Sequence, residues 1–199
     1  MTRLSVKLKN ALGLSYYRYE LTSSTYNATI DTQFTITCKC TDINGNLISG
    51  KDLTLYHDGT SVSTQTTNAS GIATWNITPT SWGIHDFNVG NIHTQVNVTG
   101  FKTINTYGTT FYVFSVDGST RTAKIELSTN NHNIKSGDAY ERTDLVSNTY
   151  KPSHTVRALA SADGKLVLYI DGSGTVAIRN TTSSAINGVT TSAILYWTY

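Results

Sequence analysis

The chain has 199 residues, a net charge of +2 and only 14% charged residues. Because the few lysines and arginines are scattered, the composition provides no electrostatic basis for binding nucleic acid or an anionic membrane. No run of about 18 apolar residues occurs, so no membrane-spanning helix is predicted. Threonine makes up about a sixth of the chain, which indicates many short strands and tight turns rather than long helices. This length suits one large β-sandwich or two domains of about 100 residues each, and a change of strand pattern near Gly100 favours two.

An N-terminal arm is predicted over residues 1–24, as a short helix or an attachment segment. Its apolar residues recur at the spacing of an amphipathic helix; they are Leu4, Leu8, Ala11 and Leu12, followed by Gly13. A helix of about ten residues is marginal by itself, so we expect the arm to dock either on its own chain or on a larger assembly. No apolar segment with a small-residue cleavage site occurs here, so we expect no secretory signal.

Residues 25–100 show the alternation of half-buried strands. Apolar residues occupy every second position from Phe34 to Cys40, with threonine or lysine between them. Asp58-Gly59 is a hairpin signal. Six or seven such short strands, with turns every 8 to 12 residues, predict an antiparallel sandwich.

This segment resembles the immunoglobulin-like repeats of invasin-type bacterial and archaeal surface adhesins. The residues that carry the resemblance are the turn Asp42, Gly45 and Asn46, the strand entry Thr67 to Trp75, and the strand Trp82 to Phe87. The resemblance implies an immunoglobulin-like β-sandwich that serves as a spacer in an adhesive protein.

Residues 101–199 have a different pattern, because their strands are apolar at successive positions. The three clearest runs are Phe111–Phe114, Leu166–Ile170 and Ile194–Trp197. Both faces of such strands are expected to be buried. We therefore predict a second, C-terminal β-sandwich of jelly-roll type that acts as a head or assembly domain, which makes the whole chain all-β.

The C-terminal segment resembles the tip module of viral tail fibres and receptor-binding proteins. The matching positions are Tyr150, Lys151, Pro152, Ser153, Asp171, Gly172, Gly174 and Trp197. The resemblance implies a homotrimer. The outer face of the closing strand would then be an oligomer interface, to which we assign Leu195, Trp197 and Tyr199, because an exposed apolar patch is rarely tolerated on a soluble monomer.

Cys38 and Cys40 permit three interpretations. Two residues apart on one strand face, their Cα atoms would stand about 6.6 Å apart with near-parallel side chains, which does not suit a disulfide. A metal site needs further ligands, and the spacing of His57, His85 and His93 matches no known ligand pattern. Core packing is the preferred interpretation, and neither a metal nor a cofactor is expected.

No catalytic residue is predicted, since no nucleophile motif or paired carboxylates are present. Asp171-Gly-Ser-Gly174 could be half of a calcium loop, but it lacks further acidic ligands, so a hairpin turn is expected.

Candidate ligand-binding residues lie in the polar segment 130–152. They are Tyr140, Tyr150 and His132; aromatic rings bind sugars and peptides by stacking, while the alternative for the tyrosines is packing at a sheet end.

These features predict a non-enzymatic virion protein of fibre or decoration type, located on the virion or outside the cell. The expected partners are further copies of the chain, other virion proteins through the arm, and a host surface glycan or protein. Two alternatives stay open: a segment of a cellular archaeal or bacterial surface adhesin, and a binding module appended to an enzyme.

Overall fold

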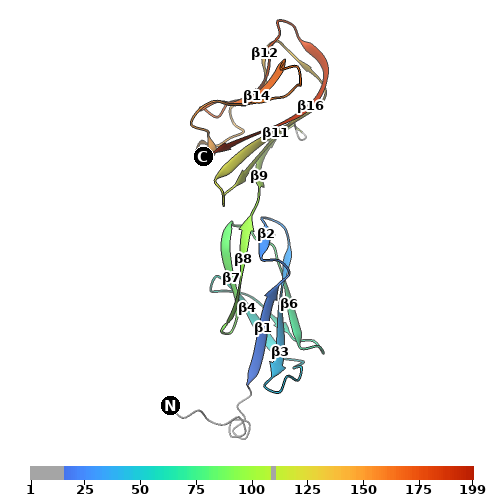
Figure 1. Cartoon of the computed structure of the whole chain (residues 1–199), viewed down its shortest axis with the longest axis vertical. Helices are drawn as coiled ribbons and strands as arrows, with labels where there is room; N and C mark the ends of the chain where they lie inside the picture. The colour runs from blue at the N-terminus through green and yellow to red at the C-terminus, as the bar shows by residue number, and fades with distance from the viewer. Residues whose placement is uncertain (1–15, 109–110) are drawn as a thin grey trace. The chain divides into compact units, whose positions relative to one another are not determined.

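The computed structural model describes residues 16–108 and 111–199 (Figure 1). These residues form four β-sheets and one short 3₁₀ turn, Asn148–Tyr150, so the predicted all-β class is confirmed. The chain divides into two compact units between Val98 and Thr99, two residues from the predicted boundary. We call them unit 1 and unit 2. No helix of the described residues is long and apolar enough to cross a membrane.

Unit 1 consists of two sheets, with strand orders β1-β3-β6 and β2-β8-β7-β4-β5. The strands are β1 (Tyr17–Ser23), β2 (Asn27–Thr29), β3 (Phe34–Asp42), β4 (Asp52–His57), β5 (Thr60–Thr66), β6 (Ile72–Ile77), β7 (Gly83–Val89) and β8 (Ile92–Thr99).

Strand β1 corrects the predicted N-terminal arm. It pairs antiparallel with β3 from Tyr17 opposite Asp42 to Ser23 opposite Ile36, and Leu21 is buried in the core. Residues 17–23 therefore belong to the sandwich, because their alternating tyrosines and leucine have the period of a strand. The helix expected near residues 4–12 lies outside the described residues.

The core of unit 1 follows the predicted alternation of β3. Phe34, Ile36, Cys38 and Cys40 are all buried, and they pack in one cluster with residues of the other sheet such as Leu55. Both cysteines are free thiols. Burial, assisted by the neighbouring Cys40, raises the pKa of Cys38 to about 11. The interpretation of the two cysteines as core residues is confirmed.

The predicted hairpin at Asp58-Gly59 joins β4 to β5. Both residues have positive φ, +49° and +79°, the pattern of a two-residue type I′ turn whose twist matches the strands it joins. This turn fixes the position of Asp58 at one end of the sandwich.

Unit 2 consists of two four-stranded sheets, with orders β16-β11-β10-β9 and β12-β15-β14-β13. The strands are β9 (Lys102–Tyr107), β10 (Tyr112–Asp117), β11 (Thr122–Ile134), β12 (Gly137–Arg142), β13 (Val156–Leu159), β14 (Leu166–Ile170), β15 (Val176–Asn180) and β16 (Ile186–Thr198). In the second sheet β13, β14 and β15 pair consecutively and β12 lies beside β15, which is a Greek-key order. The jelly-roll type itself stays a prediction.

One of the three apolar runs of unit 2 differs from the other two. In β10 and β14 nearly every residue is buried, so both faces are covered as predicted. Strand β16 alternates instead: Leu195 and Trp197 are buried, whereas Ile194 and Tyr196 are about half exposed, at 46% and 52%.

This alternation corrects the predicted oligomer interface. Leu195 and Trp197 lie inside their own unit, where the Trp197 indole stacks with Phe114 at 6.1 Å between ring centroids. Tyr199 is held by its own chain, because its carbonyl accepts a hydrogen bond from Arg121 Nε at 2.9 Å. The apolar part of the outward face of β16 is therefore formed by Ile194 and Tyr196.

The Asp171 loop is a turn, as predicted. One carboxylate oxygen of Asp171 accepts hydrogen bonds from the Ser173 and Thr175 amides, both at 2.9 Å. Burial alone would raise the pKa of Asp171, but hydrogen bonds from Ser173 and Thr175 hold it below its usual value.

Candidate functional site

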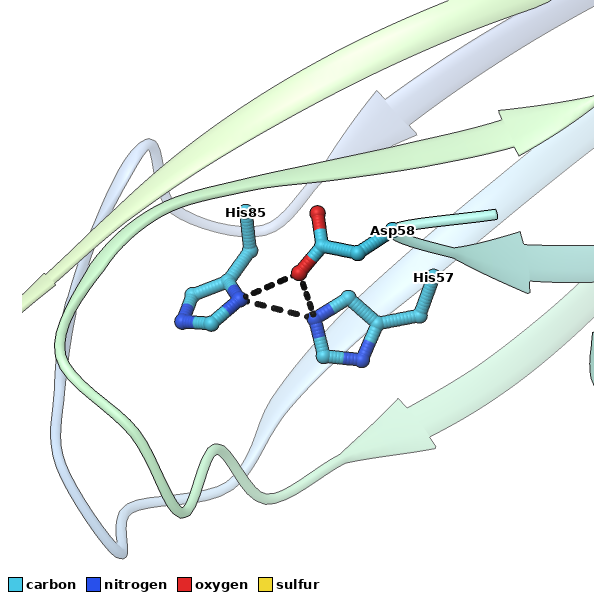
Figure 2. A group of neighbouring side chains, drawn as sticks. All are labelled: His57, Asp58 and His85. Carbon is cyan, nitrogen blue, oxygen red and sulfur yellow. Dashed lines mark hydrogen bonds and ion pairs between the residues drawn. The ribbon is translucent and has the colours of Figure 1, made fainter. Parts of the chain in front are cut away.

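Two histidines and a carboxylate converge at one end of unit 1. His57 is the last residue of β4, Asp58 is the first residue of the hairpin turn, and His85 lies in β7. Figure 2 shows that the three side chains point toward one another. His57 Nε2 lies 2.9 Å from His85 Nδ1 and 3.2 Å from Asp58 Oδ2, and His85 Nδ1 lies 2.9 Å from the same Asp58 oxygen. We call these residues the His–Asp–His cluster.

Neighbouring groups fix the orientation of each side chain in the cluster. His85 Nε2 lies 3.0 Å from the Ser81 carbonyl, and Asp58 Oδ1 accepts a hydrogen bond from the Asp86 amide at 2.8 Å. The His57 ring stacks on Phe87 at 4.5 Å with an interplanar angle of 14°. The fold therefore positions the three atoms that face one another, which are one nitrogen from each ring and one carboxylate oxygen.

The cluster is accessible from one side. The His85 side chain is only 8% exposed, but those of His57 and Asp58 are 30% and 50% exposed. Burial lowers the pKa of His57, and His85 lowers it further, although Asp58 opposes this effect. Burial would raise the pKa of Asp58, but hydrogen bonds from Asp86 and His85 outweigh it and hold the pKa low. At neutral pH these shifts favour a neutral imidazole at His57 and an ionised carboxylate.

The sequence did not predict this cluster, although it contained a signal. His57 lies on the same strand face as Leu53 and Leu55, and His85 lies on the same face as Phe87. The period of a strand therefore predicts that both rings point inward. What the spacing could not show is that β4 pairs with β7, which places His57 directly opposite Phe87.

The structure brings together two of the three predicted ligand residues. His132 and Tyr140 both pack against the Phe111 ring, with centroids 5.1 Å and 4.6 Å from it, and their own ring centroids are 5.8 Å apart. Tyr140 has a φ of +53° within an irregular stretch of β12, between Ala139 and Arg142. A non-glycine residue in this conformation is uncommon and is often found at functional sites.

Tyr150 lies elsewhere in unit 2 and has a structural role. Its ring packs edge-on against Tyr199 at 4.8 Å, and its carbonyl accepts a hydrogen bond from Trp197 Nε1 at 2.6 Å. This arrangement is the packing alternative that the sequence left open for this tyrosine.

A groove of about 470 Å³ opens beside β16 in unit 2. Its lining is mixed: the polar residues include Ser161, Asp163, Lys165, Asn187 and Thr190, and the apolar ones Leu166, Ile186 and Val189. Asp163 and Lys165 form an ion pair at 2.7 Å. None of the predicted ligand residues lines this groove.

No family model matches the chain, and no curated protein sequence matches it either. Among solved structures, the adhesin InvE of Yersinia pseudotuberculosis is similar over 91% of this chain, with 15% sequence identity and a TM-score of 0.37. The chain spans 58% of the length of that structure.

Proposed function

We propose that the chain is a non-enzymatic adhesive protein exposed outside a cell, in which unit 1 is an immunoglobulin-like spacer and unit 2 makes the contacts. The resemblance of residues 24–99 to invasin-type repeats supports the first part. Its sheets, β1-β3-β6 facing β2-β8-β7-β4-β5, also have the division between two antiparallel layers that such sandwiches use.

The outward face of β16 is the observation that carries the proposal for unit 2. Ile194 and Tyr196 are about half exposed on neighbouring outward positions, and the Phe101 ring lies 6.0 Å from that of Tyr196. The charged pair Lys124 and Glu126 sits opposite them in β11, with Nζ and Oε2 3.0 Å apart. Aromatic and apolar residues bordered by charges are typical of protein contact surfaces.

We propose that this face buries itself in a homo-oligomer, with a trimer as the expected state, and that the assembled unit 2 binds a host surface protein or glycan. Burial in a symmetric assembly removes the apolar side chains from water.

A second candidate is a viral fibre or decoration protein, with the arm of residues 1–24 attached to other virion proteins. The run from Tyr150 to Ser153, with the turn at Asp171, favours this candidate through its resemblance to fibre tips. Capsid, portal and tail genes beside the gene would support it, whereas a neighbouring gene for a secreted repeat protein would support the cellular adhesin.

Light scattering on the full chain tests the assembly. The wild type should have the mass of a trimer, and the double substitution Ile194→Ser with Tyr196→Ser should reduce it to that of a monomer. Ile84→Ser is the matched control, because Ile84 is 69% exposed on unit 1. A monomeric wild type would contradict the assembly.

Adhesion itself is tested by binding of labelled chain to cells and to immobilised glycans. We expect saturable binding by the wild type and by Ile84→Ser. A chain that binds no surface or glycan, while turning over a substrate, would overturn the adhesive function.

A further inference from the structure

We propose that His57, Asp58 and His85 form a binding site for a first-row divalent transition metal, with Zn²⁺ as the expected ion. This departs from the expectation, drawn from the sequence, that the chain binds no metal. The ligand set is two imidazole nitrogens and one carboxylate oxygen, the donors that such ions prefer.

The distances within the cluster match those between ligands of one ion. Ligand atoms about 2.1 Å from a common metal stand roughly 3.0 Å apart when they subtend a right angle and roughly 3.4 Å apart at the tetrahedral angle. The three observed separations are 2.9, 2.9 and 3.2 Å. The donor atoms therefore stand close to the separations of a three-ligand face, which leaves the remaining coordination positions open on the solvent side.

The cluster also has the supporting contacts of a metal site. A ligating histidine commonly donates its second ring N–H to a carbonyl, which fixes its tautomer. His85 Nε2 faces the Ser81 carbonyl in this way, and the Asp86 amide occupies the other oxygen of Asp58. His85 and Asp58 each therefore have one remaining donor atom that faces the cluster.

The proposed ion would link the β4–β5 turn to β7. Both elements belong to the same sheet, and the ion would add a bond between side chains that are 27 residues apart along the chain. The Asp58 side chain is half exposed, so an ion can reach this carboxylate from solvent.

Isothermal titration calorimetry of the full chain without a polyhistidine tag, after treatment with a chelator, tests the site. We expect one Zn²⁺ per chain and a higher melting temperature of unit 1, with no comparable binding of Ca²⁺, which prefers oxygen ligands. Absence of Zn²⁺ binding at 100-fold excess would overturn the proposal and leave a hydrogen-bonded cluster with a shared proton.

Substitutions of single histidines identify the residues that bind Zn²⁺. His57→Gln and His85→Gln should each weaken Zn²⁺ binding at least about tenfold, whereas His93→Gln should change it less than about twofold. His93 is a matched control, because it is exposed in the same unit and contacts Asp86 rather than the cluster. Stoichiometric binding that survives in the double variant His57→Gln with His85→Gln would overturn the assignment.

A measurement on the wild type keeps the proposal testable if the variants unfold. Addition of Zn²⁺ should shift the ¹⁵N resonances of His57 Nε2 and His85 Nδ1 and leave those of His132 and His154 in place. Shifts confined to His132 or His154 would contradict the site.

Discussion

The two units solve the same problem, covering the faces of β-sheets, in different ways. In unit 1 the strands that form the core have one buried and one wetter face, as in β3, where every second residue from Phe34 to Cys40 is buried, whereas β5 is exposed throughout. In unit 2 the strands β10 and β14 are buried on both faces. One core therefore suffices for unit 1, whereas unit 2 has to cover second faces as well.

Unit 2 also covers several aromatic rings with long cationic side chains. The Arg179 guanidinium lies 5.2 Å from the Tyr169 ring, Lys124 Nζ lies 4.9 Å from the Phe101 ring, and the Arg142 guanidinium lies 4.3 Å from the Tyr107 ring. Such side chains shield apolar surface with their stems and keep the charge near water. Apolar runs in a sequence consequently overstate how much surface has to be buried by a partner.

The largest effect is expected from truncating the aromatic core of unit 2. Phe114→Ala should lower the free energy of unfolding of unit 2 by about 3–5 kcal/mol, because Phe114 is fully buried and stacks on Trp197. Calorimetry should show this transition shifting while that of unit 1 stays in place. Equal shifts of both transitions would mean that the units unfold together.

Cys38→Ser should destabilise unit 1 by about 1–3 kcal/mol, because it buries a hydroxyl in an apolar core. Cys38→Ala separates the loss of volume from the burial of a polar group and should be less destabilising than the serine variant. If both variants have the melting temperature of the wild type, the assignment of Cys38 to the core is wrong.

Alkaline pH should weaken unit 1 through the same thiol. The pKa of Cys38 is raised from 9.0 to about 11 in the folded state, so the unfolded chain releases this proton first. The contribution is fully present below pH 9 and is lost as the pH rises toward 11. Between pH 8 and 11 the melting temperature of the wild type should fall more steeply with pH than that of Cys38→Ala. Equal slopes would contradict the raised pKa of Cys38.

The smallest effect is expected from removing a cationic side chain that packs on an aromatic ring. Arg179→Gln should cost unit 2 about 0.5–1 kcal/mol through loss of the contact with Tyr169. Arg18→Gln, at an exposed position of β1 in unit 1, is the control and should change stability by less than about 0.5 kcal/mol. Urea denaturation resolves the difference, and an equal response of the two variants would show that the contact of Arg179 with Tyr169 adds nothing to the stability of unit 2.

Much of unit 1 follows from local sequence. The period-2 pattern from Phe34 to Cys40 determines which side chains point inward, and Asp58-Gly59 determines a turn, because both depend only on backbone geometry over a few residues. The same logic was available for Tyr17–Ser23, where the preceding helical pattern led to the wrong assignment as an arm.

The sequence by itself determined the all-β class, the two-unit division, the buried cysteines and the hairpin turns. The tertiary structure alone decided which face of β16 is inside, since alternation separates Leu195 and Trp197 from Ile194 and Tyr196 but does not say which pair meets the opposing sheet. It also decided that His57 and His85 meet, because the pairing of β4 with β7 joins segments that are distant in the chain. Local periodicity sets the direction of a side chain, and only the packing of sheets sets its neighbours.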